Sequence, residues 1–412
     1  MNILFLSTEN PFPVDHGHHI RTYHVLKALA AHHHIYFVAF AQDPSGLKYT
    51  HELQGLCKSI KIFQLRFRGW RQAVLALVNL FSPLPLIAQK YHDPQTVDYI
   101  KKLIDEVKID LVHIDLLHLA NYRRALNSRP CILVNHNVES LRILRWSKIE
   151  RNILLQYFLR YQYFKLRNFE RAICTQFNRC IVVSDYDKAF LADLCGGGNF
   201  VSVPNGVDAD YFQPSDGEVI PNSLVWTGSM KSPYNRDAVI YFLGKIWPII
   251  QRNIPEARVT FVGGSPAKKL KDTAKKYPNI NYTDYVQDVR RYVAESAVFI
   301  APLRCGSGTK IKILNAMAQG KPVVTTSIGA EGIDAKPDAE IIIADAPAEF
   351  AEKTIYLLRN PQEARKIGLR ARKVITEKYD WKIINKKIEQ IYKEFEPDAN
   401  RKPAQTFVPA EV

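Results

Sequence analysis

A turn rich in glycine, hydroxyl and cationic residues is the part of this sequence best suited to chemistry. Residues 304–312 combine two glycines, a serine, a threonine, an arginine and two lysines, between an apolar run that predicts a strand and a pattern that predicts a helix. A helix start binds anions through its free N–H groups and its dipole, and glycines let the backbone approach a phosphate. Arg304, Lys310 and Lys312 could neutralise a diphosphate leaving group without a divalent ion, and Thr309 adds a hydroxyl. The alternative is an ordinary strand-to-helix turn with solvated lysines.

Two histidines stand at the ends of predicted strands in the first half of the chain. His113 lies in the run 111–114 and His136 follows the run 132–135. Open α/β sheets bind ligands at the carboxyl ends of their strands, so both side chains are expected to point into a cleft. A structural role is the alternative for each histidine.

Short apolar runs alternate with longer helical patterns along the whole chain. The predicted strands are 3–7, 35–40, 60–65, 111–114, 132–135, 180–184, 223–227, 258–262, 280–283, 298–301, 322–326 and 340–343. Such alternation predicts an α/β protein with parallel sheets covered by helices on both faces. Two sets of six strands predict two Rossmann-like, doubly wound domains that face each other across a cleft.

Turn residues concentrate around 196–206 and 214–221, which divides the chain into two domains. The prediction is a first domain over 1–200 and a second domain over 201–372. Two helical patterns follow the last strand, at 348–359 and 361–394. A helix at 373–395 is expected to pack back on the first domain, and the tail 396–412 is expected to be disordered.

The bulk composition is that of a globular protein with an anionic partner. Hydrophobic residues make up 47% of the chain, charged residues 24%, and the net charge is +15. The most apolar stretch, 73–87, is interrupted by a serine and two prolines and is too short to span a bilayer, so a cytoplasmic protein is expected. Six scattered cysteines predict reduced thiols rather than disulfides or a zinc cluster, and His32-His33-His34 predicts a helix-to-strand turn rather than a metal site.

A basic and aromatic stretch leaves three interpretations open. Residues 142–171 carry eight basic side chains among many aromatic ones, and Arg66, Arg68, Trp70 and Arg71 precede the apolar run to Phe81. This pattern suits peripheral contact with an anionic membrane such as the inner face of the cell membrane. A solvated helix with aromatics packed in the core is the second interpretation. Nucleic-acid binding is the third and least favoured, since no DNA- or RNA-binding motif accompanies the stretch.

The segment 301–324 resembles the donor-binding motif of the retaining glycosyltransferases of family 4 (group 1), which have the GT-B fold. Further matches are found, in order, at 17–24, 134–139, 182–184, 203–208, 227–230, 262–264 and 329–333. The resemblance implies an acceptor-side domain over 1–200, a nucleotide-sugar-binding domain over 201–372 and a hinge between them at residues 204–208. It also implies that a histidine at a strand end, His113 or His136, contacts and orients the donor sugar as the catalytic residue.

The resemblance further implies a set of residues around the donor diphosphate, the ribose and the base. They are Gly17, His19, Gly228, Ser229, Lys231, Gly263, Val286, Arg304, Ser307, Gly308, Thr309, Lys310, Lys312 and Asn315. Two positions depart from the family pattern, because Ser307 and Asn315 stand where the family commonly carries glutamates. His18 and His19 likewise replace glycines, and their side chains could donate to the diphosphate instead.

The expected function is transfer of a hexose-type sugar from a nucleotide-diphosphate donor to a polysaccharide, a lipid-linked glycan or another glycan. Retention is implied by the resemblance, and neither a metal ion nor a cofactor is expected. The alternative is a non-catalytic nucleotide-sugar-binding or scaffold protein of the same fold. An epimerase or phosphorylase is disfavoured, since a phosphorylase needs a much longer chain and a lysine-bound pyridoxal phosphate.

Overall fold

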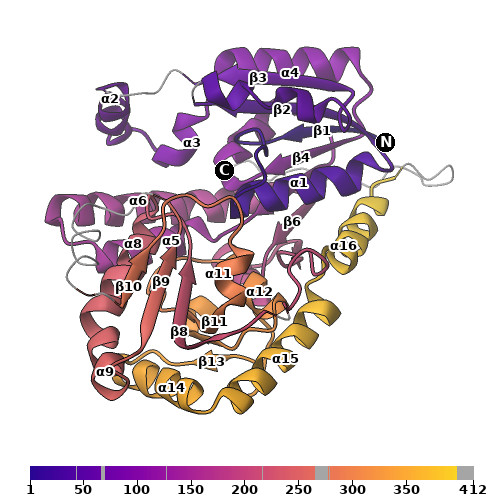
Figure 1. Ribbon diagram of the computed structural model, residues 1–412. Coiled ribbons are helices and arrows are strands. Elements are labelled where there is room, and N and C mark those ends of the chain that lie inside the picture. The colour runs from indigo at the N-terminus through magenta and orange to yellow at the C-terminus, as the bar shows by residue number, and fades with distance from the viewer. Residues whose placement is uncertain are drawn as a thin grey trace.

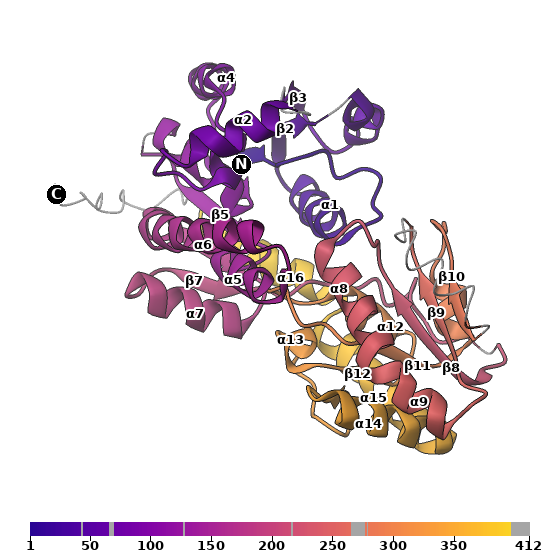
Figure 2. The same ribbon diagram turned by 90° about the vertical axis from the view of Figure 1, so that its left-hand side faces the viewer.

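The computed structural model describes residues 1–42, 44–65, 70–126, 128–215, 217–264, 277 and 279–396. It contains two parallel sheets, each covered by helices, one above the other in Figure 1 and side by side in Figure 2. The predicted tail 396–412 lies outside the described residues except for Glu396, as do Arg66 and Arg68.

The N-terminal sheet has seven parallel strands in the order β3-β2-β1-β4-β5-β6-β7. Its strands are β1 (Asn2–Leu6), β2 (His34–Ala41), β3 (Ser59–Gln64), β4 (Leu111–Asp115), β5 (Cys131–Asn135), β6 (Arg179–Val182) and β7 (Phe200–Ser202). Its helices are α1 (Gly17–Ala30), α2 (Trp70–Asn79), α3 (Leu86–Lys90), α4 (Pro94–Glu106), α5 (Glu139–Ile149), α6 (Ile153–Ile173) and α7 (Asp185–Cys195).

Alternation along β1 explains why both faces of this sheet are covered. Leu4 and Leu6 pack in a cluster with residues of α4 to α7, while Ile3 and Phe5 pack on the opposite face with residues of α1. Successive side chains of a strand point to opposite faces, so a strand that is apolar throughout must be buried on both.

The C-terminal sheet has six parallel strands in the order β10-β9-β8-β11-β12-β13. Its strands are β8 (Ile220–Thr227), β9 (Arg258–Val262), β10 (Ile280–Tyr282), β11 (Ser296–Ala301), β12 (Val323–Thr325) and β13 (Ile342–Ile343). The helices that follow are α8 (Pro233–Tyr241), α9 (Trp247–Asn253), α11 (Arg290–Ala294), α12 (Ile311–Ala318), α13 (Ser327–Ala330), α14 (Pro347–Arg359), α15 (Pro361–Lys378) and α16 (Trp381–Lys393). This strand order is that of a doubly wound nucleotide-binding fold.

The chain crosses between the domains twice, and the two crossings are paired. Val207 N donates to Tyr379 O at 2.7 Å, and Trp381 N donates to Val207 O at 3.1 Å. After the second crossing, α16 packs against α1 and buries Ile384 and Ile388 in the core beneath the N-terminal sheet. Figure 1 shows α16, in yellow, running from the lower domain up beside α1.

Two details differ from the sequence-based expectation. The single helical pattern predicted for 361–394 is wrong, because the chain breaks at Tyr379 and Asp380. Asp380 caps the new helix by accepting a hydrogen bond from Lys382 N at 2.7 Å, while the neighbouring backbone pairs with Val207. Strand β7 was not predicted, since three residues carry too little pattern to identify a strand. Each of the twelve predicted strand regions does contain a strand.

Candidate active site

The first turns of α1 and α12 meet at the boundary between the two domains. A Cβ atom on Gly17, the first residue of α1, would lie 3.4 Å from Ile311 Cδ1 at the start of α12. Within the described residues, neither N-cap residue, His16 nor Lys310, caps its helix through its side chain. Two helix dipoles therefore point their positive ends at one region, which suits an anionic ligand.

Lys312 is the second residue of α12 and lies against the loop after β8. Its Nζ is 2.8 Å from Asn235 Oδ1 and 4.2 Å from the centre of the Trp226 ring. A Cβ on Gly228 would collide with the same Nζ. Burial, with a smaller effect from the charge of Lys310, lowers the pKa of Lys312 to about 7. An arriving diphosphate would restore the charge of this amine.

The glycine turn before α12 is packed against the N-terminal domain. Ser307 Oγ accepts from Val138 N at 3.0 Å and donates to Asp187 Oδ1 at 3.2 Å, and Thr309 Oγ1 donates to Val183 O at 2.8 Å. The expectation that Thr309 adds a hydroxyl for the phosphate is therefore wrong for this structure. Both hydroxyls are used across the domain boundary.

Gly308 lies where the two domains touch, and only a residue without a side chain fits there. Its φ angle is +69°, and a Cβ there would collide with the carbonyl oxygen of His136. The prediction had assigned this space to a phosphate, whereas the backbone of the other domain occupies it.

The other two predicted cations have protein partners. Lys310 Nζ donates to Ser307 O at 3.2 Å and to Gly308 O, which braces the turn, and burial lowers its pKa to about 8. Arg304 pairs with Asp237 through two hydrogen bonds and lies over the Tyr241 ring at 4.3 Å. Of the three predicted cations, Lys312 is therefore the one beside the Gly228 loop.

The loops after β8, β9 and β10 form the wall next to Lys312. Gly263 has φ of +140°, and a Cβ on it would collide with the carbonyl of Gly228, so these two loops touch backbone to backbone. Ser229 and Lys231 are exposed at the rim, and Val286 is half-buried. The structure thus brings these predicted donor residues to one edge of the C-terminal sheet. Asn315, the remaining one, lies one turn beyond Lys312 on α12 and is half-buried.

His136 follows β5 and is held by a buried carboxylate that sequence reasoning missed. Asp115, the last residue of β4, accepts from His136 at 2.7 Å and from Thr22 Oγ1 at 2.6 Å. The other ring nitrogen of His136 lies 3.3 Å from His18 Nδ1. Burial opposes the charge of Asp115, but His136 and hydrogen bonds from neighbouring histidines outweigh it and hold its pKa well below the usual range. The carboxylate therefore fixes the orientation of His136.

His113 does not point into the cleft, so this part of the prediction is wrong. Its ring is fully buried, stacks on Phe5 with centroids 3.9 Å apart and makes a short hydrogen bond with Tyr392 of α16. The strand continues to Asp115, so His113 lies two residues before the strand end on the face that α16 covers. Burial also lowers the pKa of His113. It joins β4 to the returning helix.

His19 also turns away from the diphosphate region. Its Nδ1 donates to Pro13 O at 2.7 Å, beneath the loop that precedes α1. Its other nitrogen faces Glu9 rather than the start of α12, and a contact of His19 with the donor stays a prediction.

Arg21 and Asn205 connect the segment between the domains to the turn before α12, and neither role was predicted. Arg21 Nη1 donates to Pro204 O and to Asn205 Oδ1, each at 3.0 Å, and Asn205 Nδ2 donates to Thr309 O at 3.2 Å. Arg21 is fully buried. Arg21 lies in the family-like segment 17–24 and Asn205 in the family-like segment 203–208. Membership of those segments was the sequence signal that could have identified both residues.

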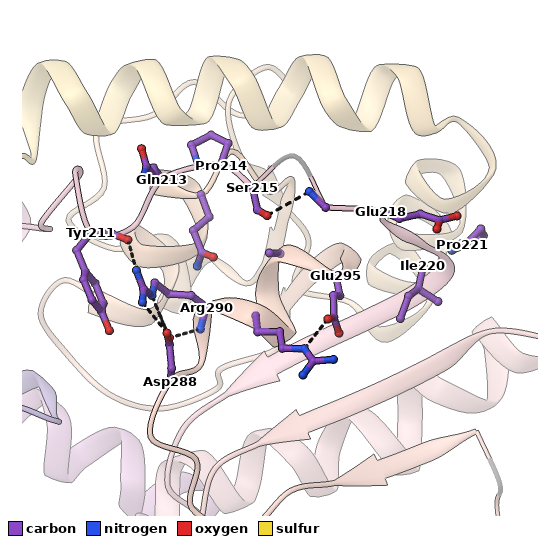
Figure 3. A pocket seen from close by; sticks show the side chains of 14 residues that line it. Tyr211, Gln213, Pro214, Ser215, Glu218, Ile220, Pro221, Asp288, Arg290 and Glu295 are labelled. Atoms are coloured by element: carbon purple, nitrogen blue, oxygen red, sulfur yellow. Dashed lines mark hydrogen bonds and ion pairs between the residues drawn. The ribbon is translucent and has the colours of Figure 1, made fainter.

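The large pocket of the C-terminal domain lies elsewhere. A pocket of about 1000 Å³ opens beside Tyr211, Ile220, Arg290 and Glu295 (Figure 3). These residues flank the amino ends of β8 and β11, whereas nucleotide sites of such sheets lie at the carboxyl ends. The Arg290 side chain also donates hydrogen bonds to Asp288 and to the Tyr211 carbonyl. We therefore do not assign this pocket to the donor.

Two doubly wound domains with paired helix starts at their shared boundary define the GT-B architecture of glycosyltransferases. Family comparison agrees: residues 16–211 match the family 4 glycosyltransferases and residues 221–360 match the group 1 glycosyl transferases. Together the two matches cover most of the chain. The protein belongs to the group 1, family 4 glycosyltransferases and is an enzyme of that class.

Similar proteins include an uncharacterised 44.6 kDa protein in the cps region of Klebsiella pneumoniae, 22% identical over 95% of this chain and 99% of that protein. A phosphatidyl-myo-inositol mannosyltransferase of Mycobacterium tuberculosis is 26% identical over 52% of this chain and 58% of its own length.

Solved structures share the fold over nearly the whole chain. A sucrose-phosphate synthase from Thermosynechococcus elongatus has a TM-score of 0.74 at 15% identity, covering 95% of this chain and 98% of that one. Anabaena Alr3699/HepE in complex with UDP-glucose has a TM-score of 0.65 at 15% identity, covering 96% and 100%. Within the described residues, no helix is both long and apolar enough to cross a bilayer.

Proposed function

We propose that this glycosyltransferase moves a hexose from a nucleotide-diphosphate donor to a polysaccharide or lipid-linked acceptor, with retention at the anomeric carbon. The observation that carries the proposal is the meeting of the α1 and α12 starts beside Lys312. Converging helix dipoles and a cation in a dry site stabilise the charge that develops on a departing diphosphate.

Transfer needs no metal ion or cofactor in this proposal. The bond between the anomeric carbon and the diphosphate oxygen breaks, and the acceptor oxygen bonds to the same face of that carbon. The acceptor proton passes to a phosphate oxygen of the leaving group. Lys312 neutralises the negative charge of the leaving diphosphate. His136, oriented by Asp115, contacts the sugar.

The relatives support the donor and acceptor classes. The M. tuberculosis relative is named for mannose transfer to phosphatidyl-myo-inositol, and a structural neighbour was solved with UDP-glucose. A hexose donor and a lipid-bearing acceptor are therefore the first to test.

Contact with an anionic membrane would bring such an acceptor to the enzyme. One side of α6 exposes Leu154, Tyr157, Tyr161 and Phe164, which follow each other at helical spacing. Exposed arginines lie beside this stripe at positions 151, 160, 167 and 171. A solvated helix would not leave an apolar stripe uncovered, so the pattern favours an interfacial helix.

Helix α2 extends the same surface. Trp70, Leu77 and Val78 are exposed, and Phe81 just beyond the helix is 92% exposed. Tyr161 Oη donates to Leu80 O at 2.7 Å, which ties the end of α2 to α6. We call the exposed side chains of α2 and α6 the apolar-basic face, and its charge complements acidic lipid headgroups.

The alternative is a protein that binds a nucleotide sugar without catalysing its transfer or hydrolysis. The replacement of the family's two glutamates by Ser307 and Asn315 favours it, and Ser307 is committed to the other domain. A neutral Asn315 would hold a ribose less strongly than a carboxylate.

A donor screen followed by a turnover assay tests the proposal. Thermal unfolding is measured with UDP, GDP, ADP and dTDP sugars, because a ligand that binds the folded state raises the melting temperature. Hydrolysis and transfer of the best donor are then followed after EDTA treatment, with Mg²⁺ or Mn²⁺ added back. Slow turnover that these ions do not increase supports the enzyme, tight binding without turnover supports the alternative, and turnover that requires them contradicts metal-independent transfer.

A further inference from the structure

The loop between β1 and α1 gathers a carboxylate and two imidazoles that sugar transfer does not use. Glu9 Oε1 lies 3.3 Å from His19 Nε2 and 3.9 Å from His16 Nε2. The two rings lie against each other with centroids 3.6 Å apart. His16 is exposed at the surface, while His19 is only 6% exposed.

Hydrogen bonds fix which nitrogen each ring presents to Glu9. His19 Nδ1 donates to Pro13 O at 2.7 Å, and His16 Nδ1 donates to Asp15 Oδ1 at 2.6 Å. Both rings therefore aim Nε2 at the same carboxylate. Histidines that ligate metals commonly have their second N–H held by a carbonyl or a carboxylate in this way.

The second ring nitrogen of His19 is buried against Glu9. Its Nε2 makes no hydrogen bond among the described residues, and the Glu9 carboxylate faces it at 3.3 Å as an ion-pair partner. A neutral imidazole would face that carboxylate lone pair to lone pair, so a proton or a metal ion belongs between them. The ligand atoms of Glu9, His16 and His19 lie within 4.8 Å of one another, so a divalent ion can bind all three groups at once.

The spacing and the ligand types favour zinc. Zinc bonds of about 2.0–2.2 Å in tetrahedral geometry set ligand atoms roughly 3.3 Å apart, which matches the distance from Glu9 to His19. The exposed His16 has room to close its longer separation. Imidazole nitrogens favour zinc and similar transition metals over magnesium or calcium. The donor set of two histidines and one glutamate also occurs in known zinc sites.

We propose that Glu9, His16 and His19 bind one zinc ion, or a similar divalent transition metal, which holds the loop before α1. Gly17 and His18 follow His16 directly, so the ion would fix the start of α1 that meets α12. His18 itself lies 3.8 Å from Glu9 Oε1, but its Nε2 is 3.1 Å from Thr8 Oγ1 and its ring adjoins His136. The ion would therefore order one wall of the cleft without touching the diphosphate.

Titration of the full-length, tag-free protein with Zn²⁺ after chelation tests this proposal. Calorimetry without donor should give one equivalent bound, and His16→Ala and His19→Ala should each weaken binding by at least about 100-fold. Asp15→Asn, which changes the carboxylate beside the Nδ1 atoms of His16 and His19, should weaken it by about 10-fold. His16 is at the surface, so His16→Ala keeps the result interpretable if His19→Ala fails to fold. Amide exchange of residues 9–16 should slow on adding Zn²⁺ to the wild type but not to His16→Ala.

Two matched variants separate other histidine clusters from this one. Replacing His32, His33 and His34 together by alanine should leave zinc binding unchanged, and so should His136→Ala, which disrupts the group formed with His18 and Asp115. No binding by the wild type, full binding by His16→Ala, or loss of binding confined to either control would overturn the proposal. Because donor is absent throughout, none of these results bears on the transferase proposal.

Discussion

Arg145 of the N-terminal domain and Glu331 of the C-terminal domain form a two-pronged ion pair across the domain boundary. Arg145 Nη1 lies 2.7 Å from Glu331 Oε2, and it also donates to Gly306 O at 2.7 Å. The side chains are 13% and 14% exposed, so water screens this pair less than a surface pair. The contact ties the position of the glycine turn to closure of the two domains.

Arg145→Met should loosen the turn before α12 while keeping most of the side-chain volume. We expect the donor KM to rise by about 10-fold, since the Gly306 carbonyl and Glu331 both lose their partner. A double-mutant cycle with Glu331→Gln should give a coupling of about 1–3 kcal/mol in thermal or denaturant unfolding. The exposed pair Arg291 and Glu295 is the control and should couple by no more than about 0.5 kcal/mol. Equal coupling in both cycles would contradict the role given to Arg145.

Donor affinity should fall as pH rises above 7 because of Lys312. Burial lowers its pKa to about 7 in the free protein, so the amine is largely neutral at pH 8, and a bound diphosphate raises the pKa again. Binding therefore takes up a proton, and the Kd should increase by up to about 10-fold per pH unit between 7 and 9. Calorimetry in two buffers with different ionisation enthalpies measures the proton uptake.

Lys312→Ala should abolish most transfer and remove this pH dependence, while the melting temperature stays within a few degrees. Lys386→Ala, at an exposed position of α16, is the matched control and should behave as the wild type. Unchanged kinetics in Lys312→Ala would count against the assigned diphosphate site.

His136 and Asp115 should act as a unit in the transfer step. His136→Ala is expected to lower kcat by about 100-fold with little change in nucleotide affinity, because its contact is to the sugar. Asp115→Asn should lower kcat through loss of the His136 orientation, and the double variant should be no worse than His136→Ala alone. Steady-state kinetics with nucleotide binding by calorimetry measures both quantities. Independent, multiplicative defects would refute the coupling.

The apolar-basic face should bind acidic vesicles in a salt-sensitive way. Arg160→Glu with Arg167→Glu should reduce sedimentation with vesicles that contain phosphatidylserine, and Leu154→Ala with Phe81→Ala should reduce it independently of salt. Arg365→Glu, on α15 of the other domain, is the control. Binding that is equal on neutral vesicles, or that survives high salt undiminished, would remove the proposed electrostatic contact.

Glu170 should destabilise the protein above neutral pH. It lies buried between α5 and α6, accepts hydrogen bonds from the Ser140 N–H and hydroxyl, and burial raises its pKa to about 7. The folded state then holds this proton more tightly than the unfolded chain, so the associated stability is full below about pH 4.5 and is lost as pH rises through 7.

Glu170→Gln, which mimics the protonated acid, should therefore gain up to about 3 kcal/mol of unfolding free energy at pH 8 and little at pH 4. Denaturant unfolding at both pH values checks this, with the exposed Glu352→Gln as control. A gain that does not depend on pH would disprove the titration.

Local patterns in the sequence were sufficient to predict the layout of the fold. Strands, helices and the glycine turn at 306–309 each form from residues that are close together in the sequence. Their apolar patterns and turn residues are therefore visible without the structure. The same holds for the start of α12, where the order of strand, turn and helix alone predicts where an anion would bind. The sequence also indicated the helix that returns to the first domain, although the cap at Asp380 was overlooked.

Tertiary structure decided which side chains meet. His113 and His136 look equivalent in the sequence, yet one is sealed under α16 and the other is held at the domain boundary by Asp115. Thr309 was expected at a phosphate and Ser307 elsewhere at the donor, but both bond to the opposite domain, and the pairing of Arg145 with Glu331 spans 186 positions. Burial and hydrogen-bond partners depend on what packs across from a residue, and for contacts between domains that information lies far along the chain.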